Sequence, residues 1–305
     1  MEQKKKKLTC SIVILTYNDF ETTDHLLRMI KEYKAFEHIV VVDNHSTDGS
    51  FDKLQTYSNS KITIMQAPGN DGYSKGNNIG IRYLLENYGS DIICVANPDI
   101  EFDEGLVHQI LKVFEKKAEY CILAGLQVAP DGELAVHPFW MEYSTRQWFR
   151  FIIRRLRIFG RILKIYDTEH YIRKKLNSEK MLFQVGAVEG SMFFIRSKEF
   201  NDTGLFDEGV WIYCEEDILA KKMKKIRMKT GVLTSATFIH YGAKTTNKVF
   251  ATKTKADHMF YSSIYYFNNY QSENKFFQAV NYILCSLVHL EDIVSAMIKN
   301  YFGKR

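Results

Sequence analysis

The sequence predicts an α/β protein in which a mostly parallel sheet is flanked by helices and followed by a helical C-terminal appendage. Over residues 1–125, short apolar runs alternate with helix-length amphipathic segments, a pattern typical of parallel strands joined by right-handed crossovers. Residues 246–305 are rich in aromatic side chains at helical spacing. A chain of 305 residues has room for one large α/β domain and an appendage. We expect these parts to be residues 1–245 and 246–305.

The expected elements follow from the spacing of apolar residues. Buried strands are expected at 10–15, 39–42, 62–65 and 92–96. Helices are expected at 21–33 and 49–57, then in a segment ending near residue 88, and at 105–117. Beyond about residue 130 the alternation is less regular, with a strand-like run at 185–196 and a helix that begins near Glu215. An apolar stretch at 231–239 then leads to His240.

Composition and cysteine usage indicate a cytoplasmic protein. A hydrophobic content of 46% and a charged content of 25% are ordinary for a soluble globular chain. The five cysteines lie far apart and form no C-x-x-C pair, which favours a reducing compartment. Residues 1–15 resemble a signal peptide only superficially, because no small-residue cleavage site follows. No apolar run reaches the roughly 18–20 residues that span a bilayer, and the nearest, 276–290, is expected to be a packed or interfacial helix.

Polar residues follow the first two expected strands directly. In open α/β sheets, ligands bind just past the carboxyl ends of the strands. Asp43 follows the second strand, and its carboxylate can accept a hydrogen bond from the N3–H of a pyrimidine or from a ribose hydroxyl. Thr16 and Asn18 follow the first strand, where a helix-capping role is an equally good interpretation. No glycine lies between residues 9 and 42, which argues against a nicotinamide-binding turn.

The segment 69–80 carries a glycine at every third or fourth position. Gly76 and Gly80 are best explained by close packing of a helix on a strand, because a helical face without side chains lets its neighbour approach closely. Asn70 and Gly72 lie in the preceding loop and are better ligand candidates. The segment lacks the Gly-Lys-Ser/Thr ending of a Walker loop.

Three further motifs carry chemistry. Asn97-Pro98-Asp99 is a rigid turn after the fourth strand, and its carboxylate can bind a divalent cation, although the motif is also a common turn. Glu215-Glu216-Asp217 opens a helix, where acids interact favourably with the helix dipole and stay ionised, as a general base requires. His240 is a lone histidine that can be structural or can complete a metal site begun by Asp99.

In this order, the motifs resemble those of the inverting family 2 glycosyltransferases of the GT-A type, especially the rhamnosyltransferase-like branch that builds bacterial surface polysaccharides. The resemblance covers about residues 9–245. The matching segments are 11–18, 42–50, 70–80, 97–99, 190–191, 204–208 and 215–217. It implies a Rossmann-like GT-A fold with a nucleotide-binding half at about 9–125. The acceptor and catalytic half would be 126–245, with a basic amphipathic insertion at 146–175.

The resemblance also implies roles for individual residues. The nucleotide would be bound by a polar set made of Thr16, Asn18, Asp43, Asn70, Gly72, Asn77 and Asn97. Mg²⁺ or Mn²⁺ would be held by Asp99 and His240. Gly190, Ser191 and Glu215 would border the donor or acceptor sugar. One acid of the triplet would deprotonate the acceptor hydroxyl, with inversion at the anomeric carbon.

Two departures from the family pattern matter. The usual Asp-x-Asp is Asn97-Pro98-Asp99 here, so its first position offers an amide. The usual acidic pair is a triplet here, and the register favours Glu216 as the base because Leu219 and His240 then fall at the expected separations. Asp217 is the alternative base.

A basic stripe runs from residue 146 to 164, with seven Lys or Arg residues and no acidic ones. It can be a solvated helix face, but we favour a membrane-surface role, since an apolar stripe flanked by arginines suits anionic headgroups. Nucleic-acid binding is not expected, because no nucleic-acid module accompanies the stripe. The sequence thus predicts a metal-dependent inverting glycosyltransferase that uses a UDP- or dTDP-sugar and a glycan or lipid-linked acceptor. The alternative is a catalytically inactive nucleotide-sugar-binding or scaffold protein, against which the joint presence of Asp99, Glu216 and His240 argues.

Overall fold

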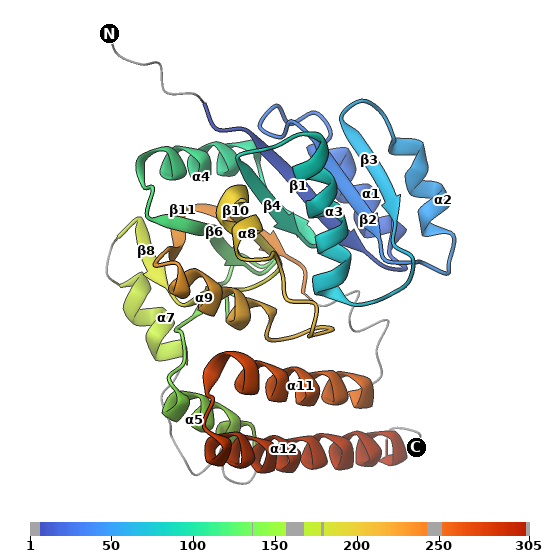
Figure 1. Ribbon diagram of the computed structural model, residues 1–305. Helices are drawn as coiled ribbons and strands as arrows, with labels where there is room; N and C mark the ends of the chain where they lie inside the picture. The colour runs from blue at the N-terminus through green and yellow to red at the C-terminus, as the bar shows by residue number, and fades with distance from the viewer. Residues whose placement is uncertain (1–6, 136, 157–167, 178–179, 243–251, 303–305) are drawn as a thin grey trace.

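A nine-stranded sheet lies between helices, and a layer of further helices lies beneath it in the view of Figure 1. Figure 1 shows the computed structural model, which describes residues 7–135, 137–156, 168–177, 180–242 and 252–302. The strand order is β3-β2-β1-β4-β10-β6-β11-β5, and β8 pairs with β11. A small second sheet is formed by β7 and β9.

The first half of the chain forms the elements that the sequence predicts, with shifted ends, a 3₁₀ turn over the last part of the helix expected at 49–57, and one short strand, β5, that was not predicted. The elements are β1 Cys10–Thr16, α1 Phe20–Ile30, β2 Ile39–Asp43, α2 Ser50–Leu54, the 3₁₀ turn Gln55–Tyr57, β3 Ile62–Gln66, α3 Tyr73–Asn87, β4 Ile92–Ala96, β5 Ile100–Glu101 and α4 Glu104–Lys116. Helix α1 ends earlier than expected, because the Tyr33 amide bonds the carbonyl of Ile30 in a tighter turn.

The second half differs more from the expectation. Its elements are β6 Tyr120–Val128, β7 Phe139–Trp140, α5 Thr145–Arg155, α7 Thr168–Leu176, β8 Leu182–Val185, β9 Ala187–Val188, β10 Met192–Arg196, α8 Ser197–Asp202, α9 Glu215–Lys225 and β11 Lys229–His240. The run at 185–196 is three strands rather than one, interrupted at Gly186 and at 189–191. The helix expected over 146–164 is found as α5, and the stripe beyond residue 156 lies outside the described residues.

The sheet is mixed, and one antiparallel strand decides where the site forms. Strands β1, β2, β3 and β4 pair in parallel, as do β6 and β11. Strand β10 runs antiparallel between β4 and β6, with Met192 opposite Ala96 and Phe194 opposite Leu123. The start of β10 therefore lies beside the carboxyl end of β4, and the Asn97 amide donates to the Ser191 carbonyl at 2.8 Å. Segments almost a hundred residues apart thus meet at one sheet edge.

Two apolar layers bury the sheet. The side chains of alternate strand residues pack against α1, α2 and α4 on one face and against α3, α8 and α9 on the other, so that Ile12 and Val13 belong to different layers. Both layers consist of fully buried aliphatic and aromatic side chains. All five cysteines are buried free thiols, as the sequence predicts.

A third apolar cluster joins α5 to two C-terminal helices, α11 Thr252–Tyr266 and α12 Lys275–Phe302, with a π turn at Phe267–Gln271 between them. Trp148 of α5 is buried there and donates its indole N–H to Asn281 of α12 at 2.8 Å. The expected boundary at 245 falls among undescribed residues. The sequence predicts no apolar run long enough to span a bilayer. By length and composition, however, the helical stretch Lys275–Met297 is long and apolar enough to cross a membrane, since only two acids interrupt it.

Gly80 provides a test of the packing between helix α3 and the sheet. A Cβ atom at this position would lie 2.7 Å from Val13 and 2.8 Å from Val42, whose branched side chains move little. We expect Gly80→Ala to lower the free energy of unfolding by about 1–2 kcal/mol, as overpacking outweighs the gain in helix propensity. Gly69→Ala is the control, since nothing lies within 3.8 Å there and a change within about 0.5 kcal/mol is expected. If both variants are equally stable in urea unfolding, helix α3 and the sheet accommodate the added methyl group without cost, and the prediction is wrong.

Candidate active site

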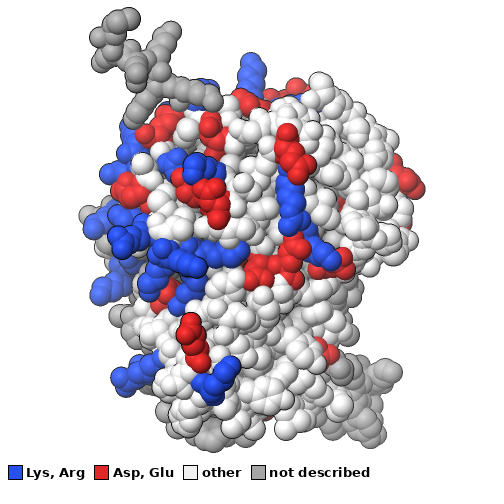
Figure 2. All heavy atoms as spheres, in the orientation of Figure 1, with Lys and Arg blue, Asp and Glu red and all other residues white. Residues whose placement is uncertain are grey.

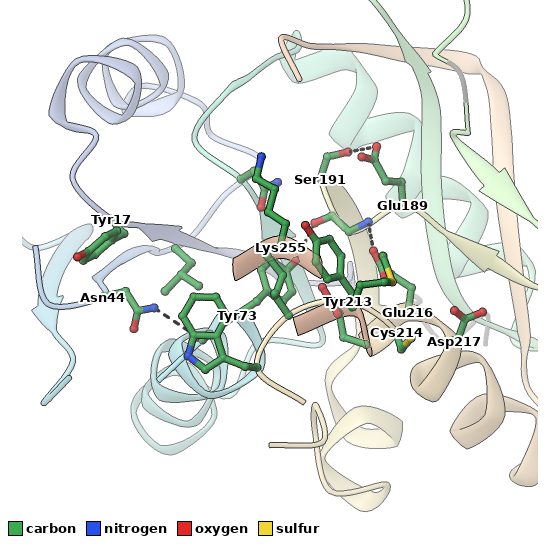
Figure 3. A pocket seen from close by; sticks show the side chains of 18 of the residues that line it. Tyr17, Asn44, Tyr73, Glu189, Ser191, Tyr213, Cys214, Glu216, Asp217 and Lys255 are labelled. Atoms are coloured by element: carbon green, nitrogen blue, oxygen red, sulfur yellow. Dashed lines mark hydrogen bonds between the residues drawn. The ribbon is translucent and has the colours of Figure 1, made fainter. Parts of the chain in front are cut away.

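One cavity of about 490 Å³ lies where the strand ends of the sheet meet the helical layer. Its wall is built from the ends of β1 and β4, the loops after β2 and before α3, the starts of β10 and α9, the end of β11, and helices α5 and α11. Eleven of the residues predicted for the site line it: Thr16, Asn70, Gly72, Asn97, Asp99, Gly190, Ser191, Glu215, Glu216, Asp217 and His240. In Figure 3, Tyr17 and Asn44 lie on one side of the cavity and Glu216 and Asp217 on the other.

Three predicted residues are not part of the cavity wall. Asn18 has its side chain engaged with the next loop, where it accepts from the Thr47 amide at 2.7 Å. Asn77 is fully buried inside α3 and donates to the Tyr73 carbonyl at 3.0 Å. Asp43 is fully buried behind Asn44.

Asp43 nevertheless keeps one unused acceptor. Its Oδ1 accepts from the Ser46 amide at 2.8 Å and from Gln66 Nε2 at 3.3 Å, whereas Oδ2 has no hydrogen-bond partner. The neighbouring Asn44 donates to Asn70 Oδ1 at 2.8 Å, and its own Oδ1 is also without a partner. Buried oxygens of this kind normally have partners, and of these two residues Asn44 lines the cavity, so its side chain is the one placed to accept from a ligand.

The turn at Gly72 is held by the segment that precedes α9. Gly72 has φ +95°, and a Cβ atom there would lie 2.2 Å from the Trp211 carbonyl oxygen. The Tyr73 amide donates to that same oxygen at 2.7 Å, and the Trp211 indole N–H donates to the Asn70 carbonyl at 3.4 Å. The position thus requires glycine for two reasons, its left-handed backbone and this close approach.

Asp99, three residues after β4, and His240, the last residue of β11, lie together in the cavity wall. His240 Nε2 is 3.3 Å from Asp99 Oδ1 and forms no hydrogen bond, and its Nδ1 is 3.5 Å from Glu189 Oε2. The Gln127 carboxamide lies 2.7 Å from Nδ1, and Ser191 donates to Glu189 at 3.1 Å. Burial lowers the pKa of His240, but the contacts and charges of Asp99 and Glu189 outweigh it and raise the pKa to about 9.

This pair fits a divalent cation only as a partial site. Among the described residues, no three His, Cys, Asp or Glu side chains are grouped so that they can hold a metal by themselves. As placed, the Gln127 amide nitrogen donates to Nδ1, which leaves the proton of a neutral His240 on Nε2, whereas a metal-binding histidine donates through its second ring nitrogen. If the Gln127 amide turns over, its unpartnered Oε1 accepts the Nδ1 proton and leaves the Nε2 lone pair available. Asp99 and His240 thus supply two ligands, and a substrate or water has to supply the rest.

The acidic triplet begins helix α9 inside the cavity. Tyr213 and Cys214, immediately before it, have φ values of 73° and 65°, a left-handed conformation that costs non-glycine residues roughly 1 kcal/mol each. This sharp turn directs the first helical residues toward the start of β10, where Glu216 Oε1 accepts from the Gly190 amide at 3.1 Å. A Cβ atom at Gly190 would lie 3.0 Å from that oxygen, so a side chain there would press on Glu216.

Burial changes the acid–base behaviour of the triplet. Desolvation raises the pKa of Glu215 to about 7 and that of Asp217 to about 6, although a hydrogen bond from Trp140 at 2.9 Å opposes the rise for Asp217. Burial and the Glu215 charge raise the pKa of Glu216 well above its usual range. Burial thus outweighs the helix dipole, which was expected to keep these acids ionised, and Glu215 and Asp217 exchange protons near neutral pH.

Several residues on the cavity wall carry no sequence signal that identifies them. Tyr73 donates its hydroxyl to the Gly190 carbonyl at 2.7 Å and joins α3 to β10, while Trp140 holds Asp217. Lys255 of α11 is the one Lys or Arg among the described residues that line the cavity, and Figure 3 shows it extending between the two sides. It faces a wall that carries five carboxylates. Only the tertiary fold brings these side chains to the site.

Comparisons with known proteins identify the class of protein that this fold and site define. Over 91% of this chain and 56% of the other, the structure is similar to GalNAc-T7, solved with UDP, GalNAc and Mn²⁺, with a TM-score of 0.60 at 16% identity. The fold is therefore the GT-A fold of glycosyltransferases, as the sequence predicts. The model of glycosyl transferase family 2 matches residues 11–180, more than half of the chain, and the chain belongs to that family.

Two sequence relatives agree with the predicted branch. The Haloferax volcanii protein Agl10, a low-salt glycan biosynthesis hexosyltransferase, is 26% identical over 230 residues, which are 75% of this chain and 66% of the relative. The Mycobacterium tuberculosis N-acetylglucosaminyl-diphospho-decaprenol L-rhamnosyltransferase is 27% identical over 230 residues, which are 72% of this chain and 71% of the relative. The resemblance to the rhamnosyltransferase-like branch is thereby confirmed.

The raised pKa values make a prediction about stability. Because Glu215 and Asp217 bind protons more tightly in the folded chain than in the unfolded one, their effect lowers the free energy of unfolding as pH rises from about 4 to 7. We expect Glu215→Gln to be more stable than the wild type at pH 8, by about 1–3 kcal/mol, with the difference shrinking toward pH 5. Glu86→Gln, at an exposed position of α3, is the matched control for denaturant titrations at each pH. A pH-independent difference would contradict the assignment of the shift to burial.

Proposed function

We propose that the protein is a metal-dependent inverting glycosyltransferase that moves a sugar from a UDP- or dTDP-sugar to a glycan or lipid-linked acceptor in the synthesis of bacterial surface polysaccharide. The observation that carries this proposal is the convergence of Asp99, His240 and Glu216 on one cavity. The relatives support it, since one is named for rhamnosyl transfer to a diphospho-decaprenol-linked sugar and another for glycan biosynthesis.

The two sides of the cavity suit the two parts of a nucleotide-sugar. The nucleoside would lie against Thr16, Asn44 and Asn70, where Asn44 Oδ1 has no hydrogen-bond partner in the protein. The diphosphate would then reach the strand ends that carry Asn97 and Asp99. With the nucleotide bound in this orientation, the sugar would lie near the Gly190–Ser191 segment and face the acidic triplet.

Electrostatics support a diphosphate only if cations accompany it. Five carboxylates line the cavity, namely those of Asp99, Glu189, Glu215, Glu216 and Asp217. A donor carries negative charge of its own, so binding requires positive charge in its path. Asp99 and His240 would hold Mg²⁺ or Mn²⁺, which offsets the charge on the departing diphosphate. Lys255 would add a fixed ammonium group on the opposite wall.

The chemical step that this arrangement supports is a single displacement. Glu216 would take the proton of the acceptor hydroxyl while the acceptor oxygen forms a bond to the anomeric carbon. The bond from that carbon to the diphosphate oxygen breaks, and its electron pair leaves on the diphosphate. Attack from the side opposite the leaving group inverts the anomeric configuration, and no covalent enzyme intermediate is formed. Asp217 is the alternative base.

We further propose that the protein works in the cytoplasm at the inner face of a membrane. A lipid-linked acceptor requires this location, and the arginines of residues 146–164 suit anionic headgroups. The structure alters one part of the sequence-based argument: Trp148, Ile152 and Leu156, the apolar side of the stripe, are buried against α11 and α12 rather than available to lipid. Arg146 and Arg154 remain exposed.

Substitution of the base tests the proposal directly. We expect Glu216→Ala to lower the transfer rate by about 10²- to 10⁴-fold, because proton abstraction from the acceptor is lost. Donor binding, measured by calorimetry, should persist, since the base lies on the acceptor side of the cavity. Asp217→Ala is the comparison: if it loses activity while Glu216→Ala keeps it, the base is Asp217. A wild-type protein that binds donor but transfers and hydrolyses none would instead favour a scaffold protein.

Donor recognition is tested by thermal shift with a panel of UDP- and dTDP-sugars, with and without Mn²⁺, because a ligand that binds the native state raises its stability. We expect Asp99→Asn to lose the Mn²⁺-dependent part of the shift.

Lys255→Met should weaken donor binding by about tenfold or more, whether or not the metal is present, through loss of a charged contact. Lys198→Met, at an exposed position of α8, is the control and should bind the donor as the wild type does. Unchanged binding by Lys255→Met would remove this residue from the donor site.

A further inference from the structure

Helix α12 presents a continuous apolar face to solvent. Phe276 is 70% exposed, Leu290 is 59% exposed and Met297 is 63% exposed, which is unusual for such large apolar side chains. With Ile283, Leu287 and Val294, which are also exposed, they recur at intervals of three, four or seven residues and so share one side of the helix. The face extends over about 32 Å, from residue 276 to residue 297. A patch of this size on a folded chain indicates a docking surface.

The opposite side of α12 packs on the rest of the protein, with buried Cys285 and Val288 in the third apolar cluster and several polar contacts beside them. Asn281 accepts from Trp148, Asp292 pairs with Arg155 of α5 at 3.3 Å, and His289 lies 3.2 Å from Asp257 of α11. A helix that crosses a bilayer would carry these groups into hydrocarbon, where polar and charged side chains are costly. Because one side of α12 is apolar and exposed while the other is already packed on the protein, the helix is suited to lie in the plane of a membrane interface.

Positive charge flanks the apolar face. Helix α5, which packs on α12, carries Arg146, Arg150 and Arg154 at intervals of four, on the side away from its buried residues Trp148 and Ile152. Lys275 is exposed at the start of α12. Between Phe276 and Leu290 no residue is charged. Figure 2 shows white spheres over the middle of α12 and Lys or Arg spheres at the lower left, where Figure 1 has α5.

The same helical layer forms part of the cavity wall. Trp148 and Phe151 of α5 and Lys255, Met259 and Ser263 of α11 line the cavity on one side, and α12 covers the other side of this layer. A surface that binds the outward face of α12 would therefore lie one helix layer away from the cavity.

We propose that α12 docks by its apolar face into the headgroup region of an anionic membrane, with the arginines of α5 contacting the lipid phosphates. A membrane is favoured over a second copy of the chain because the apolar face is flanked by several arginines. A second copy would bring a second set of these arginines into proximity with the first, whereas anionic headgroups neutralise them. That the membrane also delivers a lipid-linked acceptor rests on the proposed function, but the docking itself does not.

The test is cosedimentation of the full chain with vesicles. We expect binding to vesicles of phosphatidylcholine and phosphatidylglycerol at 7:3 and much weaker binding to phosphatidylcholine alone. Ile283→Gln together with Leu290→Gln should reduce binding by about tenfold or more, since both exposed side chains would leave the interface. Arg146→Gln together with Arg150→Gln should reduce it by roughly fivefold per charge and weaken its dependence on salt.

Controls separate the possible outcomes. Met181→Gln removes another strongly exposed apolar side chain, away from α12, and should bind vesicles as the wild type does. The thermal shift on donor addition should be the same for all these variants, so loss of donor binding would count against the proposed function and not against docking. Failure of the wild type to bind anionic vesicles, or full binding by the α12 variant, would overturn the proposal. So would sedimentation velocity showing a dimer that the α12 variant converts to monomer without any vesicle binding.

Discussion

The site depends on the antiparallel insertion of β10 between β4 and β6. Parallel strands alone would bring together only segments that follow strand ends, such as the loops after β1, β2 and β4. Because β10 runs the other way, the segment that precedes it, Gly190–Ser191, reaches the same edge and bonds Asn97. Glu216 accepts a hydrogen bond from the Gly190 amide, and the hydroxyl of Tyr73 in α3 donates to the Gly190 carbonyl. One reversed strand therefore brings together the strand end that carries Asp99, the first residue of α3 and the acidic start of α9.

The acids of this cavity are held in a way that opposes the stability of the fold. Glu215, Glu216 and Asp217 begin a helix, which favours negative charge, but burial raises all three pKa values, and repulsion from neighbouring acids adds to the rise for Glu215 and Glu216. Left-handed backbone at Tyr213 and Cys214 adds local strain at the same place. The large apolar layers on both faces of the sheet offset these costs. Such concentration of unfavourable groups in one cleft is typical of sites selected for chemistry.

The first 125 residues are the more predictable part of the chain because their signals are local. Each strand there is a short apolar run whose end is marked by polar residues, and Gly76 and Gly80 are indeed the points where α3 meets Leu15 and Val13. The second half depends on pairing between distant segments. β6 was not identified from the sequence, and the run at 185–196 was interpreted as one strand, since an apolar run alone does not show where a chain turns. Lys255 and Trp140 reach the cavity only through tertiary packing.

The contact between Trp211 and the Gly72 turn has a consequence for the order of events at the site. Trp211 lies four residues before Glu215, and its carbonyl and indole bond the loop against which the nucleoside would rest. The backbone that contacts this loop and the backbone that begins the acidic helix are one short, strained segment. A ligand that displaces the Gly72 turn would therefore have to break these two hydrogen bonds or shift the backbone that leads into the acidic helix.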